Sequence, residues 1–139
     1  MSQSKYEGIQ NELMDFVPVS CFFLSLLSVA EDYNEDYGTR KSVDFIDAYR
    51  AARKNGWLGK DFMMYNDVAL LEYLTGKKPV KKVYEGNSLT DMNVASNEYT
   101  VTKYAKGKMT HFRRRGYDVY LNSNTVKNGN LVAIYKYTF

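Results

Sequence analysis

The sequence feature that most constrains the fold is the mostly apolar stretch directly after Pro18, which contains the chain's single cysteine. Proline is excluded from a helix interior and serine is a preferred cap residue, so we predict a helix over about residues 21–33, capped by Ser20. From Phe22 to Ala30 the side chains are apolar nearly all round the helical circumference. This pattern predicts a central helix that is packed on several sides.

Cys21 is the first residue of this predicted helix. The unpaired N–H groups and the positive end of the helix dipole favour a thiolate at this position, and they can also bind a developing oxyanion. A nucleophile is therefore one interpretation of Cys21. The other is a small buried core residue, because cysteines outside disulfides are among the most buried residue types.

Length and composition indicate a single globular domain over residues 1–139. The chain is 45% apolar and 25% charged, with two prolines, which is typical of a folded protein with a sizeable core. One cysteine excludes an intramolecular disulfide, and one histidine leaves no Cys/His cluster for structural zinc. We therefore expect no metal cofactor.

Two further patterns bear on location and partners. The longest apolar run, residues 16–30, contains a proline and is shorter than the ~20 residues that span a bilayer. The first four residues lack the basic segment that opens a signal peptide. The expectation is a cytoplasmic protein with no membrane partner, and the sequence indicates no oligomeric state.

The chain divides into a helical first half and a strand-rich second half. We predict a short helix over residues 5–16, the central helix, a polar stretch over 31–41 with a loop at Gly38-Thr39, a helix capped by Ser42 and stopped by Asn55-Gly56, and a helix capped by Asn66 or Asp67 and ended by Gly76. Strands are predicted over residues 80–84, 98–104, 109–113, 117–121 and 131–139, with Asn128-Gly129 as a hairpin signal. The fold class is α+β, with an antiparallel sheet of four or five strands.

His111, the chain's only histidine, lies on the predicted strand over residues 109–113. A cysteine nucleophile needs a base to take its proton, and a histidine is the simplest base near neutral pH. The 90 residues between Cys21 and His111 are no obstacle, because catalytic partners meet in space. The alternative places His111 on a solvated surface beside the basic residues 113–115.

A third group would orient the histidine, and the hairpin after His111 limits the choice to Asp118 and Asn122. A four-residue loop places His111 directly opposite Asp118. A two-residue turn pairs His111 with Tyr120 and leaves Asp118 and Asn122 as diagonal neighbours on the same face. A three-residue loop turns both away. Asp118 is the expected third member of the catalytic triad, and Asn122 is the alternative.

This arrangement resembles the papain-like cysteine peptidase superfamily, in which a cysteine opens the central helix and a histidine and an Asp or Asn follow on the β-half. More specifically, the chain is similar to a small family of papain-like proteins from bacteria, phages and mobile elements. Three stretches carry the resemblance: residues 21–27 with Ala30-Glu31, residues 99–101 with 110–112, and Tyr117-Asp118 with 122–126.

The resemblance implies a cysteine hydrolase, acting as a peptidase, amidase or isopeptidase on a peptide or another amide-containing substrate, including a protein. In this interpretation Cys21 attacks the carbonyl carbon, His111 moves the proton and Asp118 holds the imidazole, with no cofactor. Papain-like enzymes place an oxyanion-hole glutamine shortly before the cysteine, whereas the nearest here is Gln10. The backbone N–H of Cys21 is the other expected donor.

Two other classes of function remain. A catalytically inactive papain-like binding module is the main alternative, because a fold does not establish an activity. A nucleic-acid binder would use the basic side chains that are interleaved with Tyr99, Tyr104 and Tyr117, namely Lys103, Lys106, Lys108, Arg113, Arg114 and Arg115. We expect these charges to be solvated edge or loop residues, and a net charge of +3 is low for a dedicated DNA binder.

Overall fold

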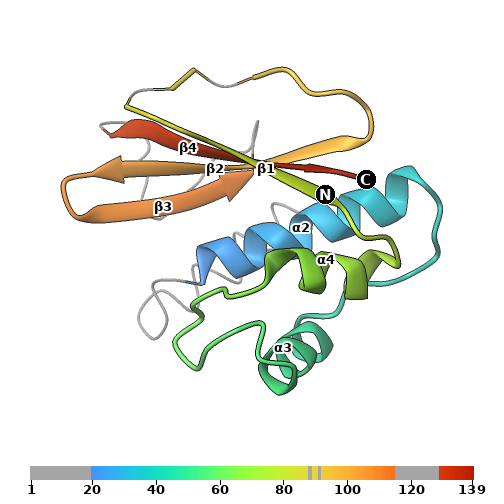
Figure 1. The fold of residues 1–139 in the computed structure, drawn as a ribbon. Helices are drawn as coiled ribbons and strands as arrows, with labels where there is room; N and C mark the ends of the chain where they lie inside the picture. The colour runs from blue at the N-terminus through green and yellow to red at the C-terminus, as the bar shows by residue number, and fades with distance from the viewer. Residues whose placement is uncertain (1–19, 88, 91, 115–128) are drawn as a thin grey trace.

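The computed structural model describes residues 20–87, 89–90, 92–114 and 129–139. The helices in these ranges are α2 (Cys21–Asp36), α3 (Phe45–Lys54) and α4 (Asp67–Thr75), and the strands are β1 (Val80–Glu85), β2 (Glu98–Lys106), β3 (Met109–Arg114) and β4 (Asn130–Thr138). They form two layers, with α2 directly against the sheet, α4 beside α2, and α3 farthest from the sheet (Figure 1). The predicted α+β class is confirmed.

The described strands form one antiparallel sheet in the order β1-β4-β2-β3. The four predicted strands that lie within the described residues are present, each with bounds within two residues of the expectation. The predicted helix over residues 5–16, the strand over 117–121 and the Asn128 half of the hairpin signal lie outside the described residues. In the described sheet, β1 and β3 are the edge strands.

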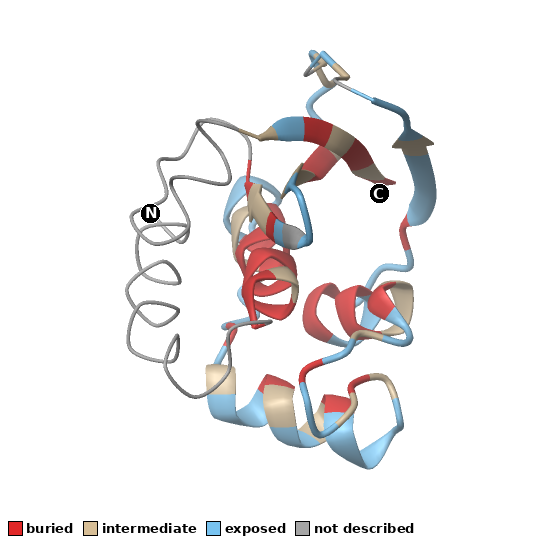
Figure 2. Cartoon of the chain, turned by 90° about the vertical axis from the view of Figure 1, so that its left-hand side faces the viewer, coloured by how far each residue is buried: buried red, intermediate tan, exposed pale blue. Residues whose placement is uncertain are grey.

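Helix α2 is the centre of the core, as its apolar pattern predicts. Every residue from Phe23 to Ala30 is buried, and Figure 2 shows buried residues along this helix between the sheet and the other helices. The helix starts at Cys21, as expected, but continues to Asp36, beyond the predicted end at about residue 33, and the predicted loop at Gly38 and Thr39 follows it. Tertiary contacts hold the extra turn: Tyr33 stacks on Phe139, and the Asn34 side-chain amide donates to the Leu74 carbonyl at 3.0 Å.

The predicted caps of α4 are confirmed, whereas the predicted caps of α2 and α3 are wrong. Asn66 caps α4, accepting from the Ala69 N–H at 3.0 Å, and Gly76 ends that helix with a φ of 83°. Ser20 occupies the cap position of α2 but has helical dihedral angles and makes no side-chain capping bond. Asp44, and not Ser42, caps α3. The two failed predictions each named a serine, whose short hydroxyl caps a helix only where the backbone is extended.

Strand alternation divides the sheet into two faces. The face toward α2 carries Tyr99, Val101 and Tyr137, which join the hydrophobic core. The opposite face carries Thr100 and Thr102, which are also buried. Each residue of β3 can therefore be assigned to one face through its register with β2.

Candidate active site

The N-terminus of α2 meets the edge strand β3 at Cys21. The backbone N–H of Phe112 donates a hydrogen bond to the Cys21 sulfur across 3.4 Å. Because β3 is the outer strand of the described sheet, this N–H points away from β2 and is available to a group beside the sheet. Cys21 itself is 5% exposed. The predicted nucleophile is therefore held against the residue that directly follows the predicted base.

Aromatic rings hold the two elements together next to this hydrogen bond. The Phe22 ring stacks on the Phe112 ring with centroids 4.4 Å apart, and both rings contact Tyr135 of β4. All three rings are partly buried. Offset stacking of this kind adds about 0.5–1.5 kcal/mol to the burial of apolar area, so the residues after Cys21 and His111 fix their relative position.

His111 is 1% exposed, so the alternative of a solvated surface histidine is wrong. Burial, with a smaller contribution from the positive charge of Arg113, lowers the pKa of His111 to about 4. The imidazole is consequently neutral at physiological pH. A neutral imidazole is the protonation state that a general base needs, although one with so low a pKa accepts a proton weakly.

The His111 side chain belongs to the sheet face opposite α2. Phe112 lies on the α2 face, where Phe22 stacks on it and the Lys103 ammonium group lies over its ring. Adjacent strand residues point to opposite faces, and Arg113 confirms the alternation by lying over the ring of Tyr104, which pairs with His111. The Cys21 sulfur lies at the edge between the two faces.

The remaining predicted site residues lie outside the described part of the chain. Asp118 and Asn122, the two candidates for the orienting group, fall in the undescribed range 115–128. Gln10, the candidate oxyanion donor, falls in the range 1–19. The described site therefore consists of Cys21, the strand segment from His111 to Arg114, and the aromatic residues around them.

Arg114 joins β3 to α2, so the expectation that its charge is solvated is wrong. Its side chain is 9% exposed, and its Nη1 donates to Ser28 Oγ and to Asp32 Oδ2, both at 2.9 Å. Ser28 and Asp32 are four residues apart and share one face of α2. In the sequence, this spacing of a serine and an aspartate indicates that one arginine could bind both side chains. In the structure, the two bonds fix the position of β3 along α2.

No metal centre is present among the described residues, where no group of three His, Cys, Asp or Glu side chains is arranged to hold an ion. An acidic surface hollow of about 400 Å³ lies near the C-terminal half of α2. Three of its carboxylates are engaged: Asp32 by Arg114, Asp36 by the Tyr99 hydroxyl and Glu98 by Lys136.

Comparison with known protein families, with curated proteins and with solved structures finds no match to this chain. Within the residues that the structure describes, no helix is long and apolar enough to cross a membrane. The function is therefore inferred from the contacts around Cys21, above all its hydrogen bond with Phe112.

Proposed function

We propose that the chain is a papain-like cysteine hydrolase, acting on a peptide, amide or isopeptide bond. The observation that supports this most is the hydrogen bond from the Phe112 N–H to the Cys21 sulfur. It joins the start of a central helix to the strand that carries the only histidine, across 91 residues of sequence. Helix first and sheet second is also the order of a papain-like domain.

In the proposed reaction the Cys21 sulfur attacks the substrate carbonyl carbon while its proton passes to His111. The carbon–nitrogen bond then breaks as His111 returns that proton to the leaving nitrogen, which leaves an acyl group on sulfur. Water, giving its proton to His111, attacks the thioester, and the carbon–sulfur bond breaks to release the acid and the thiol. Asp118, or Asn122 in its place, would orient the ring.

The low pKa of His111 sets the resting state of this site. The His111 ring is neutral at rest, because burial destabilises its charged imidazolium form and lowers its pKa. The helix N-terminus and the Phe112 N–H both stabilise negative charge on sulfur. Proton transfer would therefore accompany the attack on the substrate. Gln10 or the Cys21 N–H would stabilise the oxyanion.

A catalytically inactive binding module on the same fold is the second candidate. Strand alternation places the His111 ring on the face away from α2, and burial makes it a weak base. In this alternative Cys21 is a core residue whose sulfur accepts one edge-strand hydrogen bond. Its reactivity would then be unrelated to His111.

Alkylation and acylation distinguish the two candidates. The hydrolase is expected to react with iodoacetamide at Cys21 in the native state at pH 7, more slowly after His111→Ala. It is also expected to form an acyl adduct with a p-nitrophenyl ester, which intact mass measurement would show appearing and then decaying. Cys21→Ala is the control that should form no adduct. Equal alkylation of the wild type and His111→Ala, with no turnover of the ester, would establish the inactive module.

A further inference from the structure

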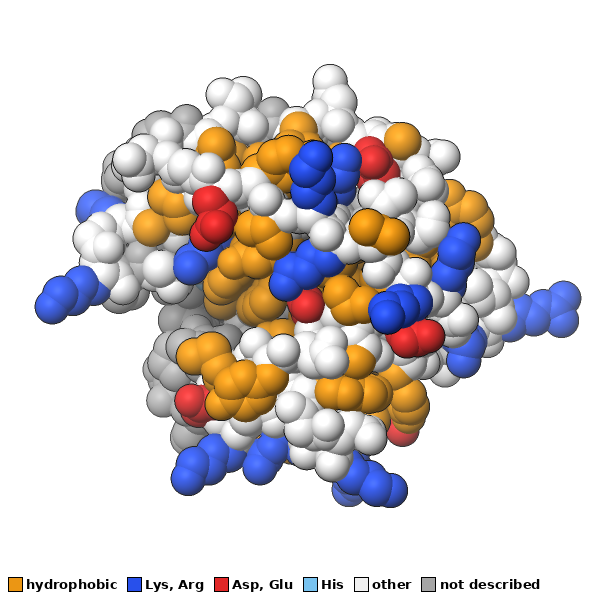
Figure 3. All heavy atoms as spheres, in the orientation of Figure 1, with side chains coloured by type: hydrophobic (Ala, Val, Ile, Leu, Met, Phe, Trp, Pro, Cys, Tyr) orange, Lys and Arg blue, Asp and Glu red, His pale blue; other side chains and the backbone are white. Residues whose placement is uncertain are grey.

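Strand β1 lies at the edge of the sheet and is open to solvent. All its residues are exposed except the half-buried Tyr84, and Val80 reaches 72%. Figure 2 shows this strand, largely in the exposed colour, at the right-hand edge of the sheet. Figure 3 looks onto the same edge, where basic and hydrophobic side chains lie side by side. In the described sheet β4 covers one edge of β1, so the other edge can pair with a further strand.

Hydrogen-bond alternation assigns each residue of β1 to one of its two edges. The Gly86 N–H, directly after the strand, donates to the Val132 carbonyl of β4 at 3.1 Å. In an antiparallel pair every second residue repeats this orientation. The residues of β1 that bond β4 are therefore Val80, Lys82 and Tyr84. The residues whose N–H and C=O groups point to the open edge are Lys81, Val83 and Glu85.

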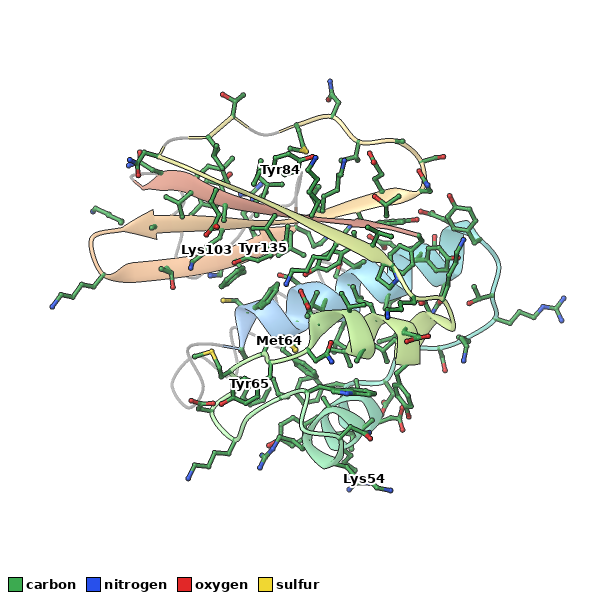
Figure 4. The ribbon with its side chains drawn as sticks, in the orientation of Figure 1. Lys54, Met64, Tyr65, Tyr84, Lys103 and Tyr135 are labelled. Atoms are coloured by element: carbon green, nitrogen blue, oxygen red, sulfur yellow. The ribbon has the colours of Figure 1, made fainter. Side chains whose placement is uncertain are left out.

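The three open-edge residues share the sheet face toward α2. Val83 pairs with Tyr135, and the Lys81 ammonium group lies 5.4 Å from the centre of the same ring. Figure 4 shows Tyr135 on the α2 side of the sheet and Tyr84 on the opposite side. Along the strand this face carries a basic, an apolar and an acidic side chain in turn. That order is complementary to its own reverse, so an antiparallel second copy would match it.

Both charges of this pattern can take part in a contact with another chain. Glu85 forms no ion pair with a described residue. The Lys81 ammonium group binds Asp67 at 2.8 Å, but its side chain is 32% exposed. An ammonium group has three N–H donors, so a bond to Asp67 leaves donors for a second carboxylate.

We propose that two copies of this chain associate through β1, as an antiparallel pair centred on Val83 that joins their sheets. Val83 then meets Val83 of the second copy, and each Lys81 meets Glu85 of the other copy. These pairs exchange about six backbone hydrogen bonds. On the opposite face Lys82 meets the Tyr84 ring of the second copy, and within one chain these two groups already lie 5.1 Å apart. The association does not depend on the reactivity of Cys21.

Neighbouring registers are less favourable. A pair centred on Lys82 sets the two Lys82 side chains opposite each other, and like charges in opposed positions destabilise a sheet. It also places Pro79, which has no N–H to donate, at an open-edge position. A pair centred on Tyr84 sets Lys81 opposite Asn87 and loses both charge pairs. The register centred on Val83 is the one that pairs opposite charges.

Sedimentation equilibrium of the full chain tests the association. The contact joins one strand edge, so we expect a monomer–dimer equilibrium with a dissociation constant in the micromolar range. Glu85→Lys sets lysines opposite each other at both ends of the pair and should raise this constant at least about tenfold. Glu35→Lys makes the same charge change on an exposed residue of α2 and should leave it unchanged. A chain that stays monomeric up to its solubility limit would overturn the proposal.

The backbone of β1 provides the test of where the two copies meet. Val83→Pro removes an N–H at the open edge and no bond to β4, so it should abolish the association in a protein that still folds. In the wild type, amide exchange followed by NMR should slow with increasing protein concentration at Lys81, Val83 and Glu85. At Lys82 and Tyr84 it should be slow at every concentration. A dimer that survives Val83→Pro, or that lacks this alternation, would use another surface and overturn the proposal.

Discussion

Arg114 and Asp32 form a largely buried ion pair, with 2.9 Å between Nη1 and Oδ2, that joins the last residue of β3 to the middle of α2. The same arginine nitrogen donates to Ser28 one helical turn earlier. Two residues before Arg114, the Phe112 N–H reaches the Cys21 sulfur. The ion pair therefore belongs to the set of contacts that holds β3 against the start of the helix.

Removal of the carboxylate should be the most damaging change to this pair. Asp32→Ala leaves the Arg114 charge buried without its ion-pair partner, and we expect it to lower the free energy of unfolding by about 3 kcal/mol. Arg114→Met, which fills similar volume and leaves no buried cation, should cost clearly less. Urea unfolding followed by circular dichroism would measure both. Equal losses of unfolding free energy for the two variants would show that the unpaired charge of Arg114 is not the cause of the destabilisation.

His111 should make stability fall as pH falls. Its pKa is about 4 in the folded state and about 6.5 when unfolded, so between these values the unfolded chain binds the extra proton. The stabilisation by the neutral ring is complete above pH 6.5 and is lost as pH decreases toward 4, by at most about 3 kcal/mol.

The measurement is urea unfolding of the wild type and of His111→Gln between pH 4 and pH 7.5. Glutamine does not titrate, so the difference in unfolding free energy between the two proteins should change with pH across this window. A constant difference would show that the imidazole of the folded protein titrates near its ordinary pKa.

Activity should persist to unusually low pH if His111 is the base. A base must be neutral to take a proton, and this imidazole becomes charged only as pH falls through about 4. The acid limb of ester turnover should therefore lie near pH 4, whereas an unperturbed histidine would place it near 6.5. An acid limb near 6.5 would contradict the assignment of the buried His111 as the base.

Two cap positions should respond differently to alanine. Asn66→Ala removes the side-chain oxygen that accepts from the Ala69 N–H, and it should cost about 1 kcal/mol in the free energy of unfolding. Ser20→Ala removes a hydroxyl that makes no capping bond and should be close to neutral. Thermal unfolding at one pH would compare them directly. A similar loss for Ser20→Ala would show that its hydroxyl stabilises α2 by another contact.

Local signals in the sequence were sufficient for most of the secondary structure. The apolar circumference of residues 22–30 predicts a buried helix because every direction around it must meet other apolar groups. Asn66 and Gly76 bound α4 through bonds and dihedral angles within a few residues. The failed predictions, the end of α2 and the caps of α2 and α3, depended on packing or on backbone conformation that neighbouring residues alone do not set.

The site shows the same division between local and long-range effects. The sequence by itself determined that Cys21 begins a central helix and that the only histidine lies on a strand, since both follow from periodicity and cap chemistry. Only the tertiary structure decided that β3 lies beside that helix, that His111 is buried with its ring away from α2, and that Arg114 is paired. These features arise from contacts between segments more than 80 residues apart, where burial and charge pairing depend on which distant groups the fold brings together.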